Sequence, residues 1–105
     1  MKHEYKIYQL DANNENVRRD GKLFKDWDML NRTCGFCFNW EYKLVWEGEE
    51  ETMEGTDDEA ILDLLFTTFN VAHPEGYHGR SLSVSDVVEL HGVKYFCDSF
   101  GWVKI

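Results

Sequence analysis

Alternating apolar and polar residues predict two strands in the first half of the chain. Apolar side chains fall at every second position from His3 to Leu10, where Tyr5 and Ile7 mark one face. The same period of two continues over a later set of aromatic and aliphatic residues: Trp40, Tyr42, Leu44 and Trp46. A period of two is typical of a strand with one buried face. Residues 11–20, between these segments, are polar and are expected to form an exposed connection.

Two further segments place apolar residues at helical spacing. The first, Lys22 to Leu30, is expected to form a short helix. The second begins with Thr56 and Glu59, which are spaced as in a capping box. Its predicted apolar face consists of Ile61, Leu64, Leu65, Thr68 and Phe69. We expect this helix to end near Asn70, because the residue before Pro74 is disfavoured in the helical conformation.

The last third of the chain predicts a β-hairpin. Residues 87–90 and 93–97 are largely apolar and are separated by His91-Gly92, a pair that suits a tight turn. Ser83 and Asp86 are expected to bond local backbone at the start of the first strand, and Asp98 and Ser99 are expected to shape the turn before Phe100. With no linker or internal repeat, residues 1–105 are predicted to form one compact α+β domain. We expect a small, mostly antiparallel sheet, one or two helices packed on it and a C-terminal β-hairpin.

The charge balance excludes some classes of partner. The 105 residues include 11 Lys and Arg against 20 Asp and Glu, which gives a net charge of −9. Such a field repels nucleic acid and anionic membrane surfaces, so neither is expected as a direct partner.

No apolar stretch approaches the roughly 20 residues that span a bilayer. The first twenty residues lack the apolar run of a signal peptide, and a cytoplasmic location is expected.

The strongest charged feature is the segment from Glu47 to Glu59, which contains eight acidic side chains and no basic one. One interpretation is a solvated loop followed by a helix N-terminus, where acidic residues are favourable. The alternative is a surface that imitates the dense negative charge of nucleic acid and occupies a nucleic-acid-binding groove of another protein. The candidate partner-binding residues of this segment are Glu47, Glu49, Glu50, Glu51, Glu54, Asp57 and Asp58.

A second set of candidates lies in the loop from His73 to Arg80, between two glycine-marked turns. Loops held on a rigid scaffold often carry binding residues. The candidates here are His73, Tyr77, His78 and Arg80.

The cysteines offer an alternative chemistry. Cys34 and Cys37 are separated by two residues, a spacing that suits a zinc ion or a redox disulfide. A complete zinc site would also need Cys97 and one of the histidines, and no second paired motif is present. We therefore expect free thiols and no cofactor or metal. A small metal- or thiol-dependent enzyme built on Cys34, Cys37, Cys97 and a histidine stays the alternative.

The C-terminal half resembles the YodL-type domain family. The resemblance rests on FNVAHP at 69–74, GRSLSVSDVVEL at 79–90 and YFCDSFGW at 95–102, with IYQL at 7–10. The family patterns are FN-x-x-HP, G-x-SLSVSDVV-x-L and YYCDSFG followed by an aromatic residue, so Phe96 replaces a tyrosine. The motifs give no alignment over residues 11–51. The resemblance implies a setting in Firmicutes phages, plasmids and conjugative elements, and it brings no catalytic or ligand residues.

Together these observations predict a non-enzymatic accessory protein of a mobile genetic element in a bacterial host cell. It is expected to bind a host or element-encoded protein. The acidic segment adds the hypothesis of anti-defence action, in which the partner is a restriction or CRISPR nuclease. A structural module that only stabilises a larger complex is a third possibility.

Overall fold

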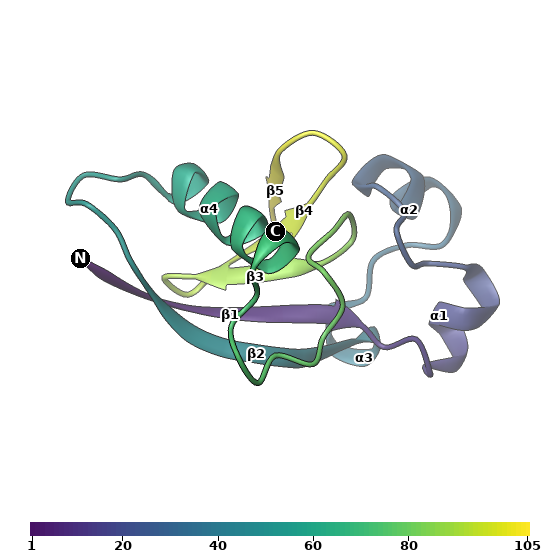
Figure 1. Ribbon diagram of the computed structural model, residues 1–105. Coiled ribbons are helices and arrows are strands. Elements are labelled where there is room, and N and C mark those ends of the chain that lie inside the picture. The colour runs from purple at the N-terminus through teal and green to yellow at the C-terminus, as the bar shows by residue number, and fades with distance from the viewer.

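The computed structural model describes all 105 residues and is built on a five-stranded antiparallel sheet (Figure 1). The strands are β1 (Lys2–Leu10), β2 (Tyr42–Glu51), β3 (Val87–Leu90), β4 (Val93–Cys97) and β5 (Trp102–Lys104). Their order is β2-β1-β3-β4-β5, which makes β2 and β5 the edge strands. The helices are α1 (Glu15–Asp20), α2 (Trp27–Thr33), α3 (Phe38–Glu41) and α4 (Asp58–Val71). The predicted α+β class is confirmed.

The predicted C-terminal hairpin is also confirmed. Strands β3 and β4 pair antiparallel, with Leu90 opposite Val93 at the turn. The turn residues His91 and Gly92 both have positive φ, +53° and +78°. Two successive residues in the left-handed region form the hairpin turn whose twist matches that of the strands.

Helix α4 covers one face of the sheet and forms the main core (Figure 1). Tyr5 and Ile7 of β1 contribute to this face. The helix buries Ile61, Leu62, Leu65 and Phe69. Leu64 is 40% exposed, so its predicted place on the apolar face is wrong. The helix is capped by Asp57 rather than Thr56, because the Asp57 carboxylate accepts from the backbone N–H of Ala60 at 2.9 Å.

The opposite face of the sheet is covered over only part of its area. Val87 and Phe96 alternate with residues that face α4, and they pack with Leu30 of α2. Aromatic side chains extend this second core, and the rings of Tyr8 and Phe38 lie 4.9 Å apart. Residues 27–42 therefore supply the cover for this half of the face, at the end of the sheet where Figure 1 shows α1 and α2.

Two expectations for residues 11–30 are wrong. Residues 15–20 form helix α1, which Asn14 caps and Val17 anchors in the core. Six residues are too few to display a helical period, which explains why the pattern gave no sign of it. The predicted helix from Lys22 begins only at Trp27, because Phe24 has a positive φ of +67° and Asp26 caps the helix.

The predicted strand from Trp40 begins two residues later. Trp40 belongs to α3 and is 77% exposed. The pairing of β2 with β1 changes register between Ile7 and Tyr8. Ile7 pairs with Trp46, whereas Tyr8 pairs with Leu44. This bulge inserts Val45 without a partner and reverses which side chains face α4. The uniform alternation in the sequence therefore spans two structural registers.

Beyond the bulge, the second face of the sheet is open and polar. An open hollow there is lined mainly by charged residues: Lys2, Glu4, Lys6, Glu47, Glu49 and Glu89. In the strand register Lys6 lies opposite Glu47, whereas Glu4 lies opposite Glu49. Like charges directly opposite one another destabilise a sheet.

None of the helices is long and apolar enough to cross a membrane.

Candidate protein-binding surface

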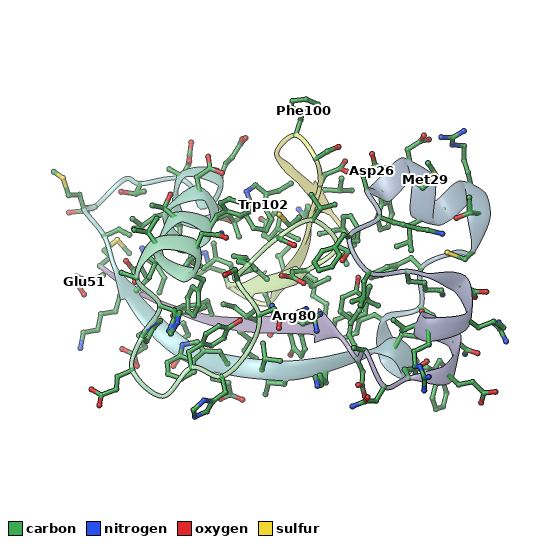
Figure 2. The ribbon with its side chains drawn as sticks, turned by 45° about the vertical axis from the view of Figure 1, so that its right-hand side comes forward. Asp26, Met29, Glu51, Arg80, Phe100 and Trp102 are labelled. Atoms are coloured by element: carbon green, nitrogen blue, oxygen red, sulfur yellow. The ribbon has the colours of Figure 1, made fainter.

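The acidic segment follows the edge of the sheet and then the connection to α4. Glu47, Glu49, Glu51 and Glu54 are all exposed, and we call them the acidic stripe. The first three alternate along β2, so their side chains share one face and repeat about every 6.7 Å. The stripe makes one ion pair, between the Glu51 carboxylate and the N-terminal amino group at 3.3 Å. Figure 2 shows Glu51 at the outer end of β2.

Three of the other predicted acidic residues are held by the fold. Glu50 is half-buried and lies on the opposite side of β2 from its neighbours. Asp57 caps α4. The Asp58 carboxylate lies 3.1 Å from His91 Nδ1 and accepts a hydrogen bond of 3.1 Å from the Tyr95 hydroxyl. The structure thus separates these three from the exposed stripe.

Asp58 belongs to a polar chain that sequence reasoning missed. The Nδ1 atom of buried His3 lies 2.7 Å from Nε2 of His91, and His3 Nε2 lies 2.7 Å from the Thr52 hydroxyl. This chain joins β1, the β3–β4 turn and the start of α4. It fixes the connection after β2, and so it positions the far end of the acidic stripe. No spacing in the sequence relates these residues, which lie up to 88 positions apart.

The loop from His73 to Arg80 is divided between exposed and buried residues. His73 and His78 are exposed. Tyr77 is 5% exposed and packs on Phe69, with ring centroids 4.9 Å apart. Its hydroxyl donates to the Arg80 carbonyl at 2.5 Å, and burial raises the pKa of Tyr77 to about 12. The Tyr77 ring is therefore part of the core and offers no contact surface.

The loop and the stripe lie on opposite faces of β2. Tyr77 packs against Trp46 with ring centroids 5.9 Å apart, on the side of α4. Glu47 and Glu49 instead line the open hollow on the other face. The exposed acidic stripe and the loop therefore do not form one continuous surface.

Arg80 and Asp86 anchor the loop through Gln9 of β1. The Gln9 amide accepts from the backbone N–H of Arg80 and donates to its carbonyl, each at 3.0 Å. Gln9 Nε2 also donates to Asp86 Oδ2 at 3.1 Å. The predicted local turn is confirmed, since the Ser83 N–H donates to the same carboxylate oxygen at 2.8 Å. Burial raises the pKa of Asp86 to about 7.

The three cysteines differ in burial. Cys97 is buried in β4, and burial raises the pKa of its thiol to about 12. Cys34 and Cys37 are half-buried near the second core. No group of three His, Cys, Asp or Glu side chains is placed to hold a metal ion. The three thiols and a histidine therefore do not come together as a metal site.

Two more features were not found from the sequence. Lys22 and Glu41 form a buried ion pair with N–O distances of 2.7 and 2.9 Å, and each side chain is 4% exposed. Phe100 is 95% exposed and projects from the loop between β4 and β5, as Figure 2 shows. The predicted turn below it is confirmed, because Asp98 Oδ1 accepts from the Ser99 N–H at 2.9 Å. That oxygen also accepts from the Trp27 N–H, which ties the turn to α2.

The fold and the surface define a small α+β protein with an acidic edge strand. A family model described as the YodL-like domain matches residues 4–105, and the chain therefore belongs to the YodL-like domain family. The match includes residues 11–51, over which the sequence motifs alone gave no alignment. Comparison with curated proteins and with solved structures found no match.

Proposed function

We propose that this YodL-like domain is a non-enzymatic accessory protein of a phage or conjugative element and acts by binding another protein. Its target is a nucleic-acid-processing enzyme of host defence, such as a restriction or CRISPR nuclease. The acidic stripe occupies positions on that enzyme that otherwise contact phosphates. The observation that carries the proposal is the exposure of Glu47, Glu49, Glu51 and Glu54 along one edge of the molecule.

Charge and spacing support this role. The net charge of −9 gives a long-range field that attracts a basic groove and speeds association at low salt. The carboxylates of Glu47, Glu49 and Glu51 repeat about every 6.7 Å along one face of β2. Successive phosphates of an extended nucleic-acid strand are separated by a step of the same order. A strand is also a more accurate support for a charge array than a loop.

The groups with displaced pKa values have roles within the fold. The Asp86 carboxylate is bonded to Gln9 and the Ser83 backbone, and the Cys97 thiol lies in the sheet. A thiol with a pKa of about 12 is protonated near neutral pH and is a weak nucleophile. These placements argue against a nucleophilic role for Cys97 in the thiol-dependent alternative.

The test is affinity capture of the tagged protein from a Firmicutes lysate at low and high salt. The stripe variant carries Glu→Gln substitutions at all four stripe positions. Its matched control carries four charge-neutralising substitutions at other exposed positions: Glu15→Gln, Asp28→Asn, Glu59→Gln and Asp63→Asn. Both variants change the net charge by the same amount, so only the position of the lost charge differs.

We expect the wild type and the control to capture the same nucleic-acid-processing enzyme and the stripe variant to lose it. Purified wild-type protein should then prevent that enzyme from binding DNA or RNA. Capture of one partner by all three proteins at every salt concentration would exclude the stripe as the interface. Equal losses in the stripe variant and the control would show that net charge alone matters.

A further inference from the structure

The outer side of β2 has backbone groups without a partner strand. β2 is ten residues long and pairs only with β1. Its backbone hydrogen bonds outside the strand pairing are few, and none joins the outer side of 47–51 to another segment. Free edges of this length are templates for the addition of another strand.

The direction of the free groups follows from the end of the strand. The Thr52 N–H donates to the Met1 carbonyl at 2.9 Å, so the backbone of Thr52 faces β1. Backbone groups alternate in direction along an antiparallel strand, and those of Glu47, Glu49 and Glu51 therefore face away from β1. The residues that offer free N–H and C=O groups are the same residues that carry the exposed carboxylates.

This coincidence selects the chemistry of an added strand. A second copy of β2 in antiparallel pairing would bring carboxylates opposite carboxylates, which is unfavourable. A strand with Lys or Arg at alternate positions would place a positive side chain beside each carboxylate while its backbone bonds to the edge. Charge complementarity thus favours a basic extended segment of a different protein.

We propose that β2 binds its partner by strand addition, and that the added segment is an extended chain with basic residues at alternate positions. This inference rests on the proposed function, since it describes how the partner of the acidic stripe is held. Backbone bonds at 47, 49 and 51 supply affinity, and the three carboxylates supply selectivity for basic side chains.

The test uses an eight-residue peptide with Lys at alternate positions and Val or Thr between them. N-methylation of every second amide leaves the peptide one bonding edge and keeps it from extending into a larger sheet. The controls are a peptide with Glu in place of Lys and a peptide of the same composition with its Lys residues adjacent. The protein variants are Glu49→Gln, which removes the charge, and Glu49→Pro, which also removes the outward N–H.

Because the Glu49 N–H faces outward, proline there removes no bond of the β1–β2 ladder. We expect Glu49→Pro to bind the alternating peptide about tenfold more weakly than Glu49→Gln, the effect of one lost hydrogen bond. Hydrogen exchange of the wild type should show the amides of Glu47, Glu49 and Glu51 protected only when the peptide is bound. This second measurement stands even where the proline variant folds poorly.

Unprotected amides in the saturated complex, or equal binding of the two Lys peptides, would overturn strand addition. Absence of binding by either Lys peptide would overturn it as well. A stripe variant that loses its natural partner, beside a Glu49→Pro variant that matches Glu49→Gln, would leave the proposed function standing and remove only this inference. A retained partner in the stripe variant would remove the proposed function itself.

Discussion

Gln9 and Asp86 are joined by a buried hydrogen bond of 3.1 Å between two segments 77 residues apart. The same Gln9 Nε2 also donates to the Arg80 carbonyl, and Gln9 Oε1 accepts from the Arg80 N–H. One amide therefore fixes both the loop before β3 and the carboxylate at its end. Because Asp86 also accepts from the Ser83 N–H, the entry into the C-terminal hairpin depends on a carboxyl group that burial holds partly protonated near neutral pH.

The raised pKa of Asp86 makes the stability of the domain sensitive to pH. The pKa is raised from 3.8 to about 7 by burial, so between those values the folded state binds more protons than the unfolded chain. Stability from this group is present below pH 4 and is lost as the pH rises through 7. Asp86→Asn stays neutral and keeps an oxygen that can accept both hydrogen bonds.

We expect Asp86→Asn to gain stability relative to the wild type as the pH rises from 5 to 8, by on the order of 2 kcal/mol or more. Urea unfolding of both proteins at several pH values measures the difference in unfolding free energy. A difference that stays constant across this range would show that Asp86 does not exchange its proton there.

The buried pair of Lys22 and Glu41 makes a single substitution costly. Lys22→Met removes the ammonium and leaves the Glu41 carboxylate buried without a counter-charge. We expect a loss of about 3–5 kcal/mol in the free energy of unfolding. The double variant Lys22→Met, Glu41→Leu replaces both charges with apolar groups and should recover most of that loss. Denaturant unfolding of the two variants decides between an unpaired buried charge and a general packing defect. A packing defect would give the double variant the lower free energy of unfolding.

The thiols should differ in reactivity. With a pKa of about 12 and little exposure, Cys97 is expected to resist alkylation by iodoacetamide at pH 8 in the folded protein. Half-buried Cys34 and Cys37 should be modified first. Peptide mass spectrometry after timed alkylation reads each position, and all three should react in urea. Early modification of Cys97 would contradict the burial that raises its pKa.

The carboxylates of β2 should also keep the domain from pairing with itself. With Glu47, Glu49 and Glu51 replaced by glutamine, the edge retains its free backbone groups but loses the like-charge repulsion. We expect this triple variant to self-associate at concentrations where the wild type remains monomeric, as measured by light scattering. A second triple variant, with Glu15, Glu59 and Glu75 changed to Gln, controls for lost solubility. Equal behaviour of the two variants would argue against the edge.

Local patterns predicted the second half of the fold well and the first half poorly. The hairpin, the turn at Ser83 and Asp86, and α4 depend on short-range signals such as His91-Gly92 and the spacing of apolar residues. α1 and the delayed start of α2 depend on tertiary contacts, for example the Phe24 N–H bonded to the Ser85 hydroxyl over 61 residues. The bulge opposite Ile7 leaves no local sign because the alternation continues across it.

The candidate surface was predicted in composition but not in arrangement. The acidic segment was evident from the sequence, but the same run supplies a helix cap at Asp57, a histidine partner at Asp58 and exposed charges at Glu47 and Glu49. Burial of Tyr77 could not be foreseen from a loop bounded by glycines. Only the folded sheet shows which carboxylates share an edge.

The partly covered second face of the sheet implies that the domain has two separable parts. The contiguous segment 27–42 supplies the aromatic cover on that face, while α4 packs on β1 and β3 to build the core on the other. Substitutions within residues 27–42 could therefore alter the shape and chemistry of that surface without disturbing the packing of α4. The face of the sheet that packs on α4 would stay constant, while the cover on the opposite face could vary.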